Sequence, residues 1–328
     1  MANKATPVSV LTGYLGAGKT TLLNRILTEQ HGQRVAVIIN EFGEIGIDHR
    51  LVTTTEECVV EMNNGCICCT VRGDLIAAIG RILADPRPWD RILIETTGLA
   101  DPAPVIQSFF MDPELKRSTR LDAIITVVDA LHIARHWEAE EAIEQIAFAD
   151  VILLNKLDLV SSDNAAKVEA RIRRYNPLAR LHHTTHGRVA LGDLLDIGAF
   201  DLARALSLDP LLLEDSTHEH DASVGAVSLQ RSGSVDERAL NRWLFQLVQA
   251  NGPDLYRMKG ILNLGNARRR FVLQGVHMLL DGRPGAAWGP DEPRTNHLVF
   301  IGKNLDSEAL ARSFDACLEP FELRHAVA

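Results

Sequence analysis

The chain has 328 residues, of which 46% are hydrophobic, and 34 Lys and Arg stand against 43 Asp and Glu, for a formal net charge of −9. This length allows two ordinary domains with apolar cores, and the acidic balance argues against nucleic acid or an anionic membrane surface as a partner. No apolar run approaches the length of a membrane span, and the first ten residues lack the apolar core of a signal peptide. We therefore expect a globular, cytoplasmic protein.

The first half of the chain has the rhythm of an α/β domain. Short runs rich in Val, Ile and Leu alternate with helical segments up to about residue 160, and the strand-like runs read VSVLT, RVAVIIN, RILIETTG, IITVVDA and VILLNKLD. Continuous apolar runs are typical of parallel strands buried on both faces. We predict that residues 1–205 form an α/β phosphate-loop NTPase domain, with a mostly parallel sheet and flanking helices.

A change of composition separates this domain from the rest of the chain. Residues 206–223 include the polar, acidic stretch LEDSTHEHDAS, which has no hydrophobic periodicity and is predicted to be a linker. Residues 224–328 contain strand-like runs, VGAVSLQRSG, MKGILNL, RFVLQGVHMLL and LVFIGK, and two helical stretches, VDERALNRWLFQLVQAN and 306–317. This pattern predicts a small α+β domain in which His277 lies inside a strand and has a structural role.

A phosphate-loop motif stands near the beginning of the chain. Gly13-x-x-x-x-Gly18-Lys19-Thr20 lies between a strand-like run and a helical run, which is the context that this motif requires. Its glycines let backbone N–H groups converge on an anion, while Lys19 neutralises the terminal phosphates and Thr20 binds Mg²⁺. The residues predicted to bind the nucleotide here are Gly13, Gly16, Ala17, Gly18, Lys19, Thr20 and Thr21.

A second stretch, ILIETTG, is predicted to complete the phosphate site. It ends in Glu95 with Gly98 three positions on, which places a carboxylate near Mg²⁺ and a backbone N–H group at the γ-phosphate. We predict that Thr20 and Glu95 hold the magnesium ion and that Lys19 and Gly98 join them in catalysis. No Gln follows Gly98, where some GTPases have one that orients water, so unassisted hydrolysis should be slow.

The stretch VILLNKLD is predicted to select the base. It ends a strand-like run in Asn155, Lys156 and Asp158, in the order Asn-Lys-x-Asp. The Asp158 carboxylate accepts two hydrogen bonds from the imino and amino groups of guanine, whereas adenine would leave it unpaired. Alone the tetrapeptide is weak evidence, but its place after Lys19 and Glu95 makes GTP and GDP the expected nucleotides.

Three cysteines, Cys66, Cys68 and Cys69, lie close together after an Asn-Gly pair. Soft thiolates select Zn²⁺ or similar late transition metals, and three ligands leave a fourth coordination position open for transfer. The anionic stretch around Glu41 is expected near this metal, where Glu41 would be a further ligand, or near Mg²⁺. The alternatives are buried apolar cysteines or a redox pair, which adjacent thiols and a reducing cytosol disfavour.

The motifs together resemble a known family. GYLGAGKTTLLN, NEFGE, NNGCICC, ETTGLADP and NKLD, in this order, look like the CobW-type metallochaperone GTPases, and the resemblance covers nearly the whole chain. It implies GTP-dependent delivery of a transition metal, bound at the three cysteines, to a client metalloprotein. The sequence is most similar to the zinc-handling branch, but cobalt- or iron-handling relatives of cobalamin synthesis and nitrile hydratase activation share the cysteine motif. The histidine tract of many members is reduced here to His218 and His220, which argues against a separate metal store.

The predicted mechanism is a switch. GTP and Mg²⁺ order the loops around Glu41 and the cysteines so that they bind Zn²⁺, or Co²⁺, tightly, and hydrolysis to GDP loosens this site. Two rivals stay open: a regulatory GTPase with a structural zinc, and an enzyme that phosphorylates a small molecule. A homo-oligomer also stays open. The histidines His182, His183 and His186 are expected in an exposed loop at a strand end, with a role near the base or the metal as the alternative.

Overall fold

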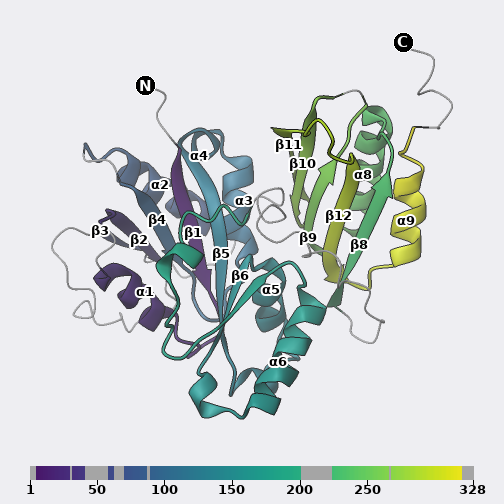
Figure 1. Ribbon diagram of the computed structural model, residues 1–328. Helices are drawn as coiled ribbons and strands as arrows, with labels where there is room; N and C mark the ends of the chain where they lie inside the picture. Colours follow the sequence, from purple (N-terminus) through teal and green to yellow (C-terminus); the bar gives the residue numbers. More distant parts are fainter. Residues whose placement is uncertain are drawn as a thin grey trace. The chain divides into compact units, whose positions relative to one another are not determined.

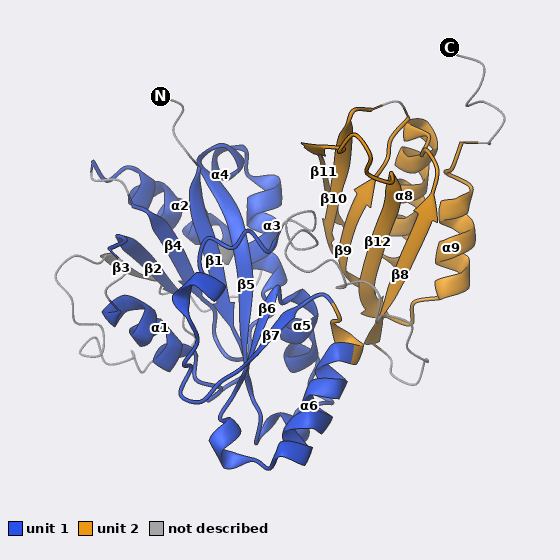
Figure 2. Cartoon of the chain, in the orientation of Figure 1, with its two compact units in different colours: residues 1–173, 178–200 blue, residues 174–177, 201–328 orange. Residues whose placement is uncertain are grey.

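The computed structural model describes seven segments of the chain, residues 5–29, 32–40, 58–62, 70–86, 89–200, 224–265 and 267–319. The chain divides into two compact units (Figure 2). The first comprises residues 1–173 and 178–200, and the second comprises residues 174–177 and 201–328. The linker predicted for residues 206–223 lies outside the described residues, so the domain boundaries at 205 and 223 stay a prediction.

The first unit is built on a seven-stranded sheet in the order β3-β2-β4-β1-β5-β6-β7 (Figure 1). Its strands are β1 (Thr6–Thr12), β2 (Val35–Asn40), β3 (Cys58–Met62), β4 (Arg91–Glu95), β5 (Thr119–Asp129), β6 (Val151–Asn155) and β7 (Arg180–His183). All neighbouring strands pair in parallel, so their carboxyl ends meet at one edge. Because β4 and β6 are buried along their whole length, their sequences are apolar throughout except for Arg91 and the terminal Glu95 and Asn155.

Helices cover both faces of this sheet. They are α1 (Lys19–Thr28), α2 (Thr70–Leu83), α3 (Ala103–Met111), α4 (Pro113–Ser118), α5 (Glu140–Phe148) and α6 (Ser162–Tyr175). Leu22 and Ile26 of α1 share a core cluster with Ile125 of β5. The next residue of β5, Thr126, points to the opposite face, where its hydroxyl donates to the backbone of Gln145 in α5. The predicted α/β phosphate-loop fold is confirmed.

The amino edge of the sheet is held by a buried ion pair. Arg91 begins β4 and Asp122 lies in β5, and their guanidinium Nη1 and carboxylate Oδ2 are 2.9 Å apart with both side chains almost fully buried. The backbone N–H groups of Asp196 and Gly198 also donate to the Asp122 carboxylate, at 2.6 and 2.7 Å, and Arg120 donates at 3.5 Å. Asp122 therefore joins three separate stretches of the first unit.

The second unit has a five-stranded antiparallel sheet in the order β11-β10-β9-β12-β8. Its elements are β8 (Val224–Ser232), α8 (Glu237–Asn251), β9 (Leu255–Leu262), β10 (Arg269–Val276), β11 (Leu279–Ala287), β12 (Thr295–Lys303) and α9 (Ser307–Asp315). Trp243 of α8 and Phe314 of α9 pack in one core with Met258 and Phe300 of the sheet. The predicted α+β domain is confirmed, and none of the helices in the described parts of the chain is long and apolar enough to cross a membrane.

The prediction that His277 lies inside a strand is wrong. Val276 ends β10 and Leu279 begins β11, so His277 and Met278 form the turn of a hairpin, and His277 has φ 50°. A two-residue hairpin turn takes positive φ values, which the apolar run around His277 conceals. The His277 ring packs edge-on against Tyr256, with 5.7 Å between the ring centroids, so its role in packing stands.

Candidate nucleotide-binding site

The phosphate loop lies at the carboxyl edge of the first sheet, between β1 and α1. Gly13 has φ 140°, and a Cβ atom there would lie 2.3 Å from the backbone oxygen of Val127 in β5. Gly18 has φ 111°, and a Cβ atom there would lie 2.7 Å from the Asn155 amide nitrogen. Only glycine fits at both positions, because the loop backbone packs directly against the ends of β5 and β6.

Lys19, the first residue of α1, turns its side chain back into this loop. Its ammonium donates to the carbonyl oxygens of Gly13 at 2.8 Å and Tyr14 at 3.4 Å, and the residue is only 9% exposed. Burial lowers the pKa of Lys19, while the nearby Glu95 carboxylate opposes this shift. A phosphate in the loop would stabilise the ammonium and take over from two neutral carbonyls, so the site is suited to an anion.

Thr20 and Glu95 meet across the sheet edge. The Thr20 hydroxyl lies 3.3 Å from Glu95 Oε1, and Glu95, the last residue of β4, is 5% exposed. A hydroxyl beside a carboxylate is a set of hard oxygen donors that suits Mg²⁺. The residues present therefore fit the predicted magnesium ion, and Thr20 and Glu95 stay its proposed ligands.

Gly98 packs directly against the backbone of the phosphate loop. A Cβ atom at Gly98 would lie 2.8 Å from both the nitrogen and the Cα of Leu15. The loop that contains Gly98 is tied to β1 where it leaves β4, because the Thr96 N–H group donates to Leu11 and the Thr96 hydroxyl donates to Thr12. The structure thus brings Lys19, Thr20, Glu95 and Gly98 to the same edge of the sheet, and their roles in catalysis stay a prediction.

Asn155 joins the phosphate loop to the loop after β7. Its amide nitrogen donates to the Ala17 carbonyl at 3.0 Å, and its amide oxygen accepts from the Thr184 hydroxyl at 3.1 Å and the Gly187 N–H group at 3.0 Å. Asn155 is 2% exposed, so this buried side chain fixes the backbone of both loops relative to each other. Asp158 lies on the surface, where its carboxylate is open to a base, and Gly16 and Thr21 are also exposed.

Lys156 has a partner that the sequence did not suggest. Its ammonium donates to the Asp129 carboxylate at 2.7 Å, and its backbone takes a left-handed conformation with φ 62°. Asp129, the last residue of β5, also accepts from the backbone and ring of His132. Burial alone would raise the pKa of Asp129, but the hydrogen bonds from Lys156 and His132 outweigh it and lower the pKa. The signal for Asp129 was its place at a strand end.

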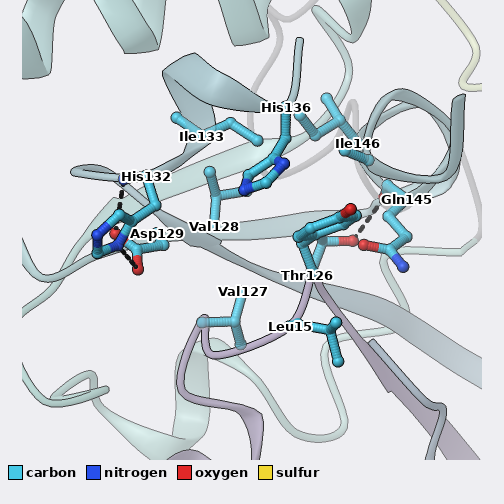
Figure 3. Close-up of a pocket in the computed structure, with 12 residues that line it drawn as sticks. Leu15, Thr126, Val127, Val128, Asp129, His132, Ile133, His136, Gln145 and Ile146 are labelled. Carbon is cyan, nitrogen blue, oxygen red and sulfur yellow. Dashed lines mark hydrogen bonds and ion pairs between the residues drawn. The ribbon is translucent and has the colours of Figure 1, made fainter. Parts of the chain in front are cut away.

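A small cavity separates the phosphate loop from α5 (Figure 3). Its volume is about 20 Å³, and its lining includes Tyr14, Leu15, His136 and Gln145. The rings of Tyr14 and His136 stack, with 4.3 Å between their centroids. A cavity of this size holds about one water molecule, so the neighbouring side chains are closely packed.

The predicted transition-metal site lies outside the described residues, since it comprises Cys66, Cys68, Cys69 and Glu41. Across the described segments, no cluster of three metal-ligating side chains occurs. Cys317 is buried in the second unit, and burial raises the pKa of its thiol to about 11. A thiol of this kind is a poor metal ligand, because thiolate is the form that binds metals. His218 and His220 also fall outside the described residues.

The three histidines at the end of β7 differ in their environments. His183 is exposed and its ring lies 2.7 Å from a Glu169 carboxylate oxygen, whereas His182 is half-buried and burial lowers its pKa. His186 is exposed in the loop whose Gly187 N–H group donates to Asn155. His182 and His183 belong to β7, so the expectation of an exposed loop holds only for His186, whose loop contacts the site.

Comparison with known protein families shows to which family the chain belongs. Residues 7–183 match the family described as CobW/HypB/UreG, nucleotide-binding domain, and this match covers more than half of the chain. The chain belongs to this family. Residues 224–318 match the family described as Cobalamin synthesis protein cobW C-terminal domain. The predicted CobW-type family and the predicted GTPase are confirmed.

Relatives match over almost the full length of the chain. It is 36% identical to the zinc chaperone YjiA of Escherichia coli K12, over 94% of this chain and 97% of that protein. It is 32% identical to the zinc-regulated GTPase metalloprotein activator 1 of Schizosaccharomyces pombe, over 91% of this chain and 82% of that protein. The crystal structure of Zn(II)-bound YjiA GTPase from E. coli superposes with a TM-score of 0.75 at 31% identity, covering 96% and 100% of the two chains.

Proposed function

We propose that this chain is a GTP-dependent zinc chaperone that binds Zn²⁺ at Cys66, Cys68 and Cys69 and delivers it to a client metalloprotein when GTP is hydrolysed. The observation that carries this proposal is the strand order of the first sheet, in which β3, β2 and β4 are neighbours and end at the edge where the phosphate loop lies. Relatives over almost the whole length are a zinc chaperone and a zinc-regulated GTPase, which favours zinc over cobalt or iron as the cargo.

The parallel sheet brings the ends of β2 and β3, after which Glu41 and the cysteine segment follow in the sequence, to the edge that carries the nucleotide site. Strands β3, β2 and β4 are neighbours, and Met62, Asn40 and Glu95 are their last residues. Glu41 follows β2 directly, and three residues separate Met62 from Cys66. The four Cα–Cα steps from Met62 to Cys66 span about 14 Å at most when extended. The chain therefore leaves β2 and β3, toward the proposed zinc ligands in the sequence, at the same edge that carries Glu95, Lys19 and the phosphate loop.

Hydrolysis of GTP would drive this switch, and residues of the described chain would bind the nucleotide. Lys19 and the N-terminus of α1 would bind the β- and γ-phosphates, Gly98 would donate its N–H group to the γ-phosphate, and Asp158 would accept hydrogen bonds from guanine. Thr20 and Glu95 would hold Mg²⁺, which would supply charge neutralisation at the phosphates. Because Leu99 follows Gly98, hydrolysis without a client or another activator is expected to be slow.

Loss of the γ-phosphate would remove the contacts that order the loops after β2 and β3, and the affinity for Zn²⁺ would fall. Thiolate ligation also releases protons, so the affinity for Zn²⁺ is expected to fall in acid. The second unit is the proposed site of client selection, since the first unit's sheet edge is occupied by nucleotide and metal.

The test is a competition titration with Zn²⁺ and Co²⁺ on the purified full chain, bound either to Mg²⁺-GDP or to Mg²⁺ with a non-hydrolysable GTP analogue. Cys66→Ser is the test variant, and Cys317→Ser, a change to a buried thiol of the second unit, is its control. Tighter Zn²⁺ binding with the GTP analogue, lost in Cys66→Ser and kept in Cys317→Ser, supports the proposal.

Two outcomes would overturn parts of it. Equal Zn²⁺ affinity in the two nucleotide states would leave a regulatory GTPase with a structural zinc. Stronger gating of Co²⁺ than of Zn²⁺ would move the chain to a cobalt-handling role.

A further inference from the structure

Gln145 links α5 to the loop that follows β4. The residue is 1% exposed, and its side-chain amide nitrogen donates to two backbone carbonyls of that loop, Gly98 at 3.2 Å and Ala100 at 3.1 Å. Both amide hydrogens therefore point into one loop. A buried amide with two acceptors fixes the position of the backbone that carries them.

The same loop contacts the phosphate loop on its other side. Gly98 packs against the backbone of Leu15 so closely that a Cβ atom at Gly98 would lie 2.8 Å from the Leu15 nitrogen. Loop residues 96–100 are thus held between the phosphate loop and Gln145. The side chain of Gln145 has little room to turn elsewhere, because the neighbouring cavity measures only about 20 Å³.

Helix α5 is itself fixed to the sheet at this residue. The Thr126 hydroxyl of β5 donates to the backbone carbonyl of Gln145 at 2.7 Å (Figure 3). This bond uses the main chain of Gln145, whereas the bonds to Gly98 and Ala100 use its side chain. A side-chain substitution at Gln145 therefore removes the hold on the loop and leaves the Thr126 bond in place.

We propose that Gln145 is a positioning residue that holds Gly98 close to the phosphate loop, where its N–H group meets the γ-phosphate, and so favours GTP over GDP. GDP has no γ-phosphate and makes no demand on Gly98, so Gln145 acts on one nucleotide and not on the other. The inference rests on the GTPase site alone and is independent of metal delivery.

The test compares the affinity of the full chain for GDP and for a non-hydrolysable GTP analogue. Gln145→Met keeps the side-chain length and removes both donors. We expect it to weaken binding of the analogue about tenfold, the factor for one to two ordinary hydrogen bonds, and to change GDP affinity less than about twofold. Single-turnover GTP hydrolysis should slow in the same variant.

Thr126→Val is the matched control. It removes a hydrogen bond from the same residue of α5 but leaves the side-chain bonds to the loop, so it should lower the melting temperature without changing the ratio of the two affinities. If Gln145→Met does not fold, Gln145→Asn replaces it, because its shorter side chain does not span both carbonyls. An unchanged affinity ratio in a folded variant, or an equal loss for GDP and the analogue, overturns the inference.

Discussion

Each edge of the first sheet has a buried charged side chain, but the two charges have different partners and different roles. At the amino edge, the buried Asp122 carboxylate accepts from Arg91, Arg120 and two backbone N–H groups, and all of these donors belong to the chain. At the carboxyl edge, the buried Lys19 ammonium holds two neutral carbonyls of its own loop. A charge with charged and fixed partners serves stability, whereas a charge with weak partners is free to exchange them for a ligand.

The comparison predicts that Asp122→Ala has the largest effect, and on stability alone. Removing one partner of a buried ion pair leaves the Arg91 guanidinium uncompensated and should cost about 3–5 kcal/mol of unfolding free energy. Urea unfolding measures this loss, and calorimetry should find unchanged GDP affinity in the folded fraction. Asp90→Asn, an exposed change at the same edge, should cost less than about 1 kcal/mol. A large loss of GDP affinity in Asp122→Ala would break the distinction between the edges.

Lys19→Ala should show the opposite behaviour. The loss of a buried cation facing phosphate should weaken GDP and GTP binding by about 3 kcal/mol, on the order of 100-fold. Unfolding free energy should stay the same or rise, because burial lowers the pKa of Lys19 and so disfavours the charged group in the folded chain. Thr28→Ala at the far end of α1 is the control, with no change in affinity. A stability loss above about 2 kcal/mol in Lys19→Ala would give this residue a structural role as well.

Asn155→Ala sharpens the comparison, because Asn155 contacts the phosphate loop and its side-chain amide makes three hydrogen bonds within the chain. Three hydrogen bonds to Ala17, Thr184 and Gly187 disappear, so unfolding free energy should fall by about 1–3 kcal/mol. Nucleotide affinity should fall as well, since the phosphate loop and the loop after β7 would no longer be held in fixed positions. Unfolding free energy and nucleotide affinity should be measured on one sample. A fall in only one of them would give Asn155 a role in stability alone or in nucleotide binding alone.

Much of this arrangement was accessible from the sequence. The apolar runs that end in Thr12, Glu95 and Asn155 are buried parallel strands, and parallel pairing carries their polar ends to one edge. The phosphate-loop motif is local, since its glycines and Lys19 act within eight consecutive residues. Both features depend on periodicity and short spacing, which a single sequence contains.

The contacts that the sequence did not reveal are non-local. Gln145 reaches Gly98 across 47 positions, and Asp129 meets Lys156 across 27. Nothing in the amphipathic pattern of EEAIEQIAF distinguishes a Gln that packs from a Gln that holds a loop. The turn at His277 was missed for a related reason, because an apolar run that continues through a hairpin hides the turn.

The smallest expected effect concerns pH. Hydrogen bonds from Lys156 and His132 lower the pKa of Asp129 despite its burial, so its stabilising contribution is complete above the unfolded-state value of about 4. That contribution is lost as the pH falls through the lower folded-state pKa. Urea unfolding between pH 7 and 3 should therefore show a steeper acid loss for the native chain than for Asp129→Asn. Parallel slopes in the two proteins would contradict this assignment.

The central claim is that GTP and zinc bind to coupled sites, and the most direct measurement is the affinity for a non-hydrolysable GTP analogue with and without saturating Zn²⁺. Thermodynamic linkage requires that Zn²⁺ tighten the analogue by the same factor by which the analogue tightens Zn²⁺. We predict a gain of about fivefold or more for the analogue, little change for GDP, and no gain in Cys66→Ser. The same analogue affinity with and without Zn²⁺ would contradict the account.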